Sequence, residues 1–300
     1  MLAKLSFRIK KTLSADCVCK RYDHGTLLLR AGVEGQDEIE RYIRDRAFLD
    51  VDESNRIVTR NRRYRLYMFP IPSTGIDAVM KVSWDNPAYP KWRRLVIRLA
   101  EVFWDRSEAA FLGALTLLHA GVPTIKPIAC WTYEPSFAGR ESYLLYEKID
   151  AVGSVRDLKM QTQQSTGKPD TPAVEPLAHL VRDLHQQGLW HHDLSLSNFL
   201  LPHPGDHVGP DDQNHPNAIY VIDTDGVSER RFRWPLFSRI REINALRRLN
   251  LAPIEGERFL RHYLGPSYKR SWLLFYRFSS SQFSRPWRPL IRSLKRAGCW

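Results

Sequence analysis

One string of polar residues in the second half of the chain could carry out acid–base chemistry. The string HHDLSLSN places Asp193 and Asn198 five residues apart, between a predicted helix and a short predicted strand. Side chains at that spacing in a loop can face one small space, where a carboxylate accepts a hydroxyl proton and an amide oxygen holds a cation. The plainer alternative is a turn in which both side chains cap the backbone.

A second string, YVIDTDG, ends an apolar strand in a carboxylate. Asp223 then lies at the strand tip, where a metal ion could bind. Asp225 is either a second metal ligand or a turn residue before Gly226.

A third candidate is Lys81, inside the apolar strand AVMKV. A lysine in such a strand needs an anion, either a phosphate or a carboxylate, unless its stem runs along a strand edge to water. Glu108, on the helix that follows, is a candidate partner or a solvated helix residue. Glu101 lies seven residues earlier and is the rival partner.

Periodicity and turn residues predict the elements that must position these side chains. We expect strands at 26–30, 62–69, 77–84, 128–133, 142–146, 199–201 and 219–222, helices over 91–120 and from 172 to Gly188, a surface loop at 202–217, and basic helices from 235. Cys17 and Cys19 fit strand positions better than a ligand pair. A strand-rich half followed by a mainly helical half predicts a two-lobed α+β fold with a boundary near residues 147–150.

Charge is distributed unevenly along the 300 residues. The net charge is +12, yet residues 230–300 carry 17 lysines and arginines against three acidic residues, while residues 1–229 carry 28 against 30. A near-neutral body with a basic end predicts an anionic partner at that end. The hydrophobic share of 43% excludes wholesale disorder.

Four cysteines in a chain of this length do not form a disulfide framework, which favours a reducing cytoplasm. Charges at Lys4, Arg8, Lys10 and Lys11 leave no signal-peptide core, and the longest uncharged stretch, 109–125, is too short to span a bilayer. We expect a soluble or peripheral protein.

In this order, the strings resemble the signature set of protein-kinase-like enzymes. HHDLSLSN is similar to H-R-D-L-x-x-x-N, VIDTDG stands where D-F-G stands, and AVMKV is similar to V-A-I-K followed by a helix glutamate. The resemblance covers about residues 60–250. It implies a protein-kinase-like fold with an ATP-binding β-rich lobe at 1–147 and a mainly helical catalytic lobe at 148–300.

Two further stretches resemble the bacterial lipopolysaccharide core kinases, which phosphorylate heptose or 3-deoxy-manno-octulosonic acid (Kdo). They are the passage LHAGVPT at 118–124 with Pro127, and the basic helix SRIREINAL at 238–246. This resemblance implies ATP-dependent phosphorylation of an inner-core sugar, with the lipopolysaccharide core glycolipid as acceptor.

The resemblance also implies a role for each candidate. Asp193 would orient or deprotonate the acceptor hydroxyl, while Asn198 and Asp223 would hold Mg²⁺ against the ATP phosphates. Lys81 would neutralise the α- and β-phosphates and be held by Glu108. The backbone of the hinge, residues 147–150, would read adenine through Glu147 and Ile149.

Departures from the protein-kinase pattern narrow the class of acceptor molecule. No G-x-G-x-x-G is present, so the phosphates must be covered by another loop or by Arg60, Arg62, Arg63 and Arg65. His192 replaces the arginine that reads a phosphorylated activation loop, and no A-P-E follows Asp223. Without that segment, a small-molecule or glycolipid acceptor is favoured over a peptide.

The basic tail interleaves aromatic and cationic residues over 270–300. It fits a solvated helix face, an anionic lipid surface or single-stranded nucleic acid. The kinase resemblance favours the cytoplasmic face of a bacterial inner membrane over nucleic acid. The alternatives are a kinase of another small molecule, a protein kinase, or a non-catalytic lipid- or nucleic-acid-binding protein on a kinase scaffold.

Overall fold

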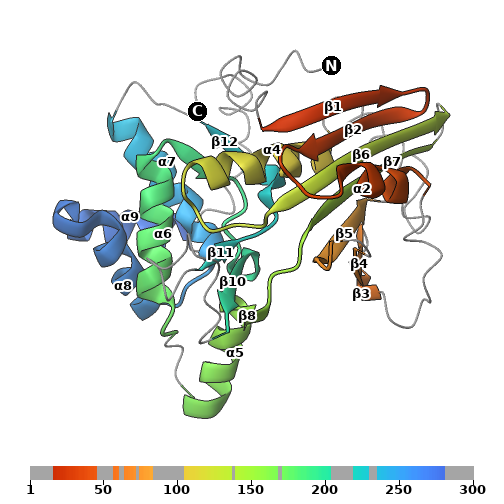
Figure 1. Ribbon diagram of the computed structural model, residues 1–300. Helices are drawn as coiled ribbons and strands as arrows, with labels where there is room; N and C mark the ends of the chain where they lie inside the picture. Colours follow the sequence, from red (N-terminus) through yellow and green to blue (C-terminus); the bar gives the residue numbers. More distant parts are fainter. Residues whose placement is uncertain are drawn as a thin grey trace. The chain divides into compact units, whose positions relative to one another are not determined.

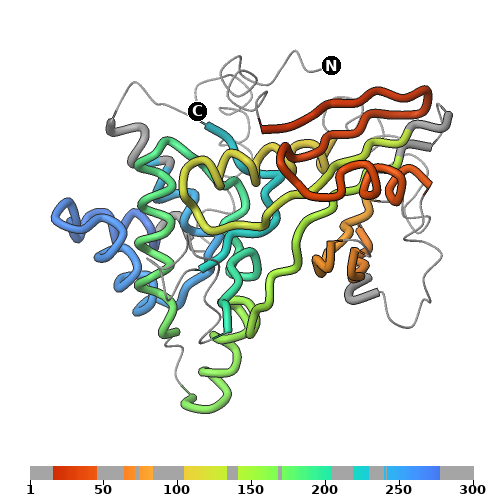
Figure 2. Tube along the Cα trace, viewed as in Figure 1, coloured from red at the N-terminus to blue at the C-terminus, as the bar shows by residue number. Residues whose placement is uncertain are grey.

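The computed structural model describes residues 16–45, 57–60, 64–71, 74–83, 105–136, 139–167, 171–203, 219–229 and 235–280, which are the coloured parts of Figure 2. The chain packs as two compact units. The first consists of Met1–Asp150 and Tyr220–Val227, and the second of Ala151–Ile219 and Ser228–Trp300. Sequence order placed Tyr220–Val227 in the second lobe, whereas its packing places it in the first unit.

The first unit is built on an antiparallel sheet, which has seven strands within the described residues and the order β1-β2-β6-β7-β5-β4-β3 (Figure 1). The strands are β1 (Cys17–Tyr22), β2 (Gly25–Arg30), β3 (Ile57–Arg60), β4 (Tyr64–Pro70), β5 (Asp77–Ser83), β6 (Pro127–Ser136) and β7 (Gly139–Glu147). They confirm the five strands predicted in this half of the chain and the strand positions of the first two cysteines. The sheet also gains β3, which was not predicted.

Within the part of the chain that the structure describes, a helix packs on each face of this sheet. On one face, Met80 and Val82 of β5 belong to a buried cluster with Ile39 and Ile43 of α2 (Gln36–Arg44). Successive side chains of a strand point to opposite faces, so Lys81 points to the other one. That face carries a second cluster, built around α4 (Arg106–His119).

Helix α4 begins later than periodicity predicted. The backbone of Asp105 is extended (φ −76°, ψ 117°), and its carboxylate accepts hydrogen bonds from the N–H groups of Ser107 (2.8 Å) and Glu108 (3.1 Å). A single helix over 91–120 is therefore wrong, because an N-cap interrupts it; residues 91–104 lie outside the described residues. Thr132 of β6 also donates to Asp105, at 2.5 Å, which fixes the start of the helix on the sheet.

The second unit is mainly helical, as predicted. Its elements are β8 (Ala151–Ser154), α5 (Val155–Thr166), α6 (Val174–Gln186), β9 (Leu189–His191), β10 (Phe199–Pro202), α7 (Pro235–Leu246), α8 (Pro253–Leu264) and α9 (Arg270–Ser280). Short 3₁₀ turns are η4 (Leu196–Asn198), η7 (Arg247–Leu249) and η8 (Gly265–Ser267). Figure 1 shows α6 beside α8, and the two helices are in contact.

Helix α5 was missed, although Ser154 and Asp157 form a capping box at its start. Among the described residues, no helix combines the length and apolarity that crossing a bilayer requires. Most of the predicted loop at 202–217 lies outside the described residues.

A buried carboxylate ties α5 to α8. The Glu255 side chain is fully buried and accepts hydrogen bonds from Lys159 Nζ (2.7 Å), Thr171 Oγ1 (2.6 Å) and the Ala252 N–H (2.9 Å). Burial alone would raise the pKa of Glu255, but these donors outweigh burial and lower the pKa. The ionised carboxylate thus stabilises the second unit.

We expect Glu255→Gln to lower the free energy of unfolding by about 3 kcal/mol, because it leaves the Lys159 ammonium without its counter-charge. Urea unfolding at pH 7 measures this. A carboxylate with a lowered pKa adds stability above its unfolded-state pKa, so the deficit should shrink as pH falls through the native pKa. Glu257→Gln, on the same helix but in a solvent-exposed pair with Arg261, is the matched control and should change stability little. Equal losses in both variants would contradict this role of Glu255.

Candidate active site

The first unit brings two of the predicted site residues together. Lys81 Nζ lies 2.6 Å from Asp223 Oδ1, with 20% and 36% of the two side chains exposed. Lys81 Nζ also lies 4.9 Å from the centre of the Tyr64 ring. The anion that a lysine inside an apolar strand requires is here a carboxylate from 142 residues further along the chain.

Backbone contacts hold the segment that carries Asp223. The Val221 N–H donates to the Pro123 carbonyl (2.9 Å), and Thr124 Oγ1 donates to the Val221 carbonyl (2.6 Å). Both partners lie just after α4, and Thr124 forms a parallel bridge with Val221. Strand β11 (Tyr220–Val221) is thus fixed within the first unit immediately before Asp223.

The residues after Asp223 pack directly on α4. Asp223 itself has left-handed backbone angles (φ 59°, ψ 50°) and leads into the 3₁₀ turn η6 (Thr224–Gly226). The fully buried Thr224 donates through Oγ1 to the Ala110 carbonyl at 2.6 Å. A Cβ added to Gly113 would lie 2.2 Å from the Thr224 carbonyl oxygen, so only a glycine permits this approach.

A partly buried phenol lies near the carboxylate. Burial, and then the negative charge of Asp223 and the neighbouring Tyr64, raise the pKa of Tyr146 well above its ordinary value. The Tyr146 phenol is therefore neutral at physiological pH and adds no negative charge beside Asp223.

The structure does not bring Glu108 to Lys81. Glu108 lies in the first turn of α4. Among the described residues, the contacts of Lys81 are with Asp223 and Tyr64. The rival, Glu101, lies outside the described residues.

Part of the predicted hinge backbone forms hydrogen bonds within the first unit. The Glu147 N–H donates to the Lys126 carbonyl (3.0 Å), the Lys148 N–H donates to the Asp77 carbonyl (2.8 Å), and the Glu147 carboxylate pairs with Arg30 (2.9 Å). The Ile149 side chain packs on the α4 cluster.

The HHDLSLSN loop lies in the second unit and is fixed by its own side chains. The Asp193 N–H donates to Nδ1 of the buried His191 (3.2 Å), and Asn198 Nδ2 donates to the Asp193 carbonyl (3.0 Å). Buried apolar side chains alternate with these polar ones: Leu194, Leu196 and Phe199. His191 is buried and thus packs as a structural residue of the loop.

No motif in the sequence predicts a cation beside Asp193. Arg248 Nη1 lies 3.3 Å from Asp193 Oδ1, and each side chain is roughly half exposed (56% and 51%). Arg248 comes from η7, 55 residues further on, and no motif spacing links the two positions. His192 Nε2, for its part, lies 3.0 Å from Ser228 Oγ.

The sheet-rich unit carries the lysine–aspartate pair and the helical unit carries the Asp/Asn loop, which are the kinase-like motifs of the sequence. Residues 104–263 match the lipopolysaccharide kinase (Kdo/WaaP) family. The chain therefore belongs to that family of kinases, whose phosphate donor is ATP, and the resemblance drawn from the sequence is confirmed.

Solved structures give two further likenesses. A structure described as WaaP in complex with acyl carrier protein is 18% identical, with a TM-score of 0.47 and coverage of 90% of this chain and 97% of that chain. The BubR1 kinase domain is 12% identical, with a TM-score of 0.33 and coverage of 71% and 50%. No curated protein gave a significant match.

The close packing of Gly113 generates a prediction. Gly113→Ala should displace the Thr224 carbonyl, lower the melting temperature and loosen the segment Tyr220–Val227. Hydrogen exchange followed by mass spectrometry should show at least tenfold faster exchange there. Gly256→Ala is the matched control, because its Cβ would meet a Tyr276 ring carbon at 2.8 Å in the other unit. Unchanged exchange in the segment would show that α4 does not hold it.

Proposed function

We propose that this protein transfers the γ-phosphoryl group of ATP to a hydroxyl of heptose or Kdo in the inner core of lipopolysaccharide. The observation that carries the proposal is the family match over residues 104–263, which includes Asp193, Asn198 and Asp223. The pairing of Asp223 with Lys81 supports it from the structure.

Asp193 is the group that acts on the acceptor. Two hydrogen bonds fix its backbone, while about half of its side chain is open to solvent and so reachable by a sugar hydroxyl. A positioned carboxylate orients that hydroxyl and accepts its proton as the bond to phosphorus forms.

Asn198 and Asp223 offer oxygen ligands. Asn198 uses its amide nitrogen on the Asp193 carbonyl, so its oxygen is the atom that it can offer to a cation. An amide oxygen and a carboxylate are hard donors that fit Mg²⁺. When bound, Mg²⁺ neutralises charge on the ATP phosphates.

Lys81 and the hinge bind the nucleotide in the proposed reaction. The bond to Asp223 holds the Lys81 ammonium in one orientation, ready for the α- and β-phosphates. Strand β7 ends at Glu147, and in the proposed reaction the backbone of the hinge reads adenine through Glu147 and Ile149. Phosphoryl transfer depends mainly on such positioning and charge neutralisation.

Arg248 adds a cation on the acceptor side. A guanidinium has five N–H donors, and its contact with Asp193 leaves donors for a second anion. In the proposed reaction, Arg248 orients Asp193 and attracts the negative charge of the acceptor or of the transferring group.

The first test separates the two aspartates. With labelled ATP and dephosphorylated core lipopolysaccharide, Asp193→Ala should reduce transfer at least 10³-fold while Mg-ATP binding stays within about twofold. Asp223→Ala should weaken Mg-ATP binding itself at least tenfold, because it removes a metal ligand and the partner of Lys81. Asp183→Asn, an exposed carboxylate of α6, is the matched control and should behave as wild type.

The outcomes separate the parts of the proposal. Full turnover by Asp193→Ala would overturn the assignment of the catalytic loop. Intact Mg-ATP binding without label in the glycolipid would move the search to another small acceptor. If the wild type neither labels the glycolipid nor binds Mg-ATP, a binding role for the basic tail would remain.

We also propose that the protein works at the cytoplasmic face of the inner membrane, bound there as a peripheral protein. Helix α9 has Leu273 and Tyr276 buried within the second unit, while Leu274 is 61% exposed and Arg270 and Arg277 face solvent. Further arginines and tryptophans follow at 281–300 in the sequence. Aromatic and cationic residues together suit an anionic lipid surface.

The membrane test must spare α9, because its buried side chains belong to the second unit. A chain that ends after Ser280 should co-sediment at least tenfold less with vesicles containing phosphatidylglycerol than the full chain does. An Arg292→Gln, Lys295→Gln, Arg296→Gln variant of the full chain separates charge from length. Equal binding of the full chain to neutral and anionic vesicles would overturn the membrane proposal.

A further inference from the structure

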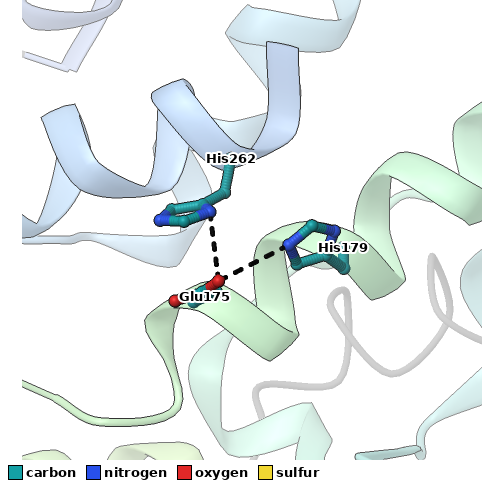
Figure 3. A group of neighbouring side chains, drawn as sticks. All are labelled: Glu175, His179 and His262. Carbon is teal, nitrogen blue, oxygen red and sulfur yellow. Dashed lines mark ion pairs between the residues drawn. The ribbon is translucent and has the colours of Figure 1, made fainter. Parts of the chain in front are cut away.

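Three metal-binding side chains meet on the second unit, on elements that the proposed reaction does not use. Glu175 and His179 lie on α6, and His262 lies on α8 (Figure 3). One ligand atom from each lies within 4.8 Å of the others. We propose that these three residues form a Zn²⁺ site that joins α6 to α8.

The distances fit metal ligands better than hydrogen bonds. Glu175 Oε1 lies 3.4 Å from His262 Nδ1 and 3.9 Å from His179 Nε2. Both separations exceed the range of an N–H···O hydrogen bond. Around a tetrahedral Zn²⁺ with bonds of 2.0–2.1 Å, ligand atoms stand about 3.3 Å apart. One carboxylate oxygen faces both imidazoles, as the two dashed lines in Figure 3 show.

The chemistry of the set indicates which ion it would take. Two imidazoles and one carboxylate are borderline nitrogen and oxygen ligands, which suit Zn²⁺ and disfavour Mg²⁺ and Ca²⁺. The three side chains are 57%, 41% and 31% exposed, so water can complete a four-coordinate shell. Three protein ligands and a water make a reversible site.

The helices hold the ligands on a rigid base. Glu175 and His179 are four residues apart and so lie on one face of α6. The other side of α6 is buried, and the Tyr263 hydroxyl of α8 lies 2.6 Å from His185 Nδ1 of α6. Sites built on packed helices keep their geometry better than sites on loops.

Arg182 competes with the metal. Its Nη2 lies 2.8 Å from His179 Nδ1, so the guanidinium donates to that nitrogen, and its Nη1 donates to the His262 carbonyl (3.2 Å). A neutral His179 in this arrangement carries its proton on Nε2, the atom that faces Glu175. Zn²⁺ uptake therefore requires the proton to move to Nδ1 and Arg182 to turn away, which sets the affinity below that of an unobstructed site.

Calorimetric titration of the untagged, chelator-treated full chain with Zn²⁺ tests the proposal. Excess Mg²⁺ is kept present to fill hard-oxygen sites such as Asp223. We expect one Zn²⁺ per chain and a higher melting temperature. His262→Ala and His179→Ala should each weaken binding at least tenfold and abolish the melting shift. Arg182→Gln should tighten binding at least threefold, since it removes the competing donor.

Two controls account for other histidines. His24→Gln alters an exposed histidine of the first unit, and His203→Gln, His207→Gln, His215→Gln in one chain removes the histidines of the predicted loop. Both should bind Zn²⁺ as wild type does. Co²⁺ should give the intense visible bands of a tetrahedral site in wild type and lose them in His262→Ala. Absence of Zn²⁺ binding, or binding that survives unchanged in His262→Ala and His179→Ala, would overturn the proposal.

Discussion

A positive charge inside an antiparallel sheet must be neutralised, and most of the first unit serves that requirement. Lys81 points from β5 toward α4, and the counter-charge reaches it from Asp223. The carboxylate stays there because Tyr220–Val227 is fixed by backbone bonds to the residues after α4 and by the packing of η6 on α4. The sheet positions the helix, the helix positions the turn, and the turn positions the carboxylate.

Local pattern predicted much of this arrangement. The apolar run around Lys81 predicted β5, and the polar string at Asp193 and Asn198 predicted a loop before a short strand, because both signals lie within a few residues. Periodicity failed at Asp105, where a helical pattern continued across an N-cap. It also missed α5, whose capping box lies in an otherwise polar stretch.

Contacts between distant parts of the chain could not be predicted from the sequence. The helix glutamate Glu108 was the expected partner of Lys81, yet the pair forms with Asp223, which was expected only to bind metal. Arg248 contacts Asp193 from a basic stretch of the sequence whose pattern fits a solvent-exposed face equally well. Such pairs are set by tertiary packing, for which a single sequence carries no spacing signal.

The first unit is discontinuous in the chain, and this constrains how the protein is made. Residues Met1–Asp150 leave the ribosome well before Tyr220–Val227, the piece that completes their packing. At ordinary synthesis rates the interval is roughly 4–15 s. During that time Lys81 lacks its carboxylate, and the Thr224 carbonyl that packs on Gly113 is absent. The nascent sheet therefore stays incompletely folded until Tyr220–Val227 has been synthesised and packs on it. The two units cannot complete their folding strictly one after the other.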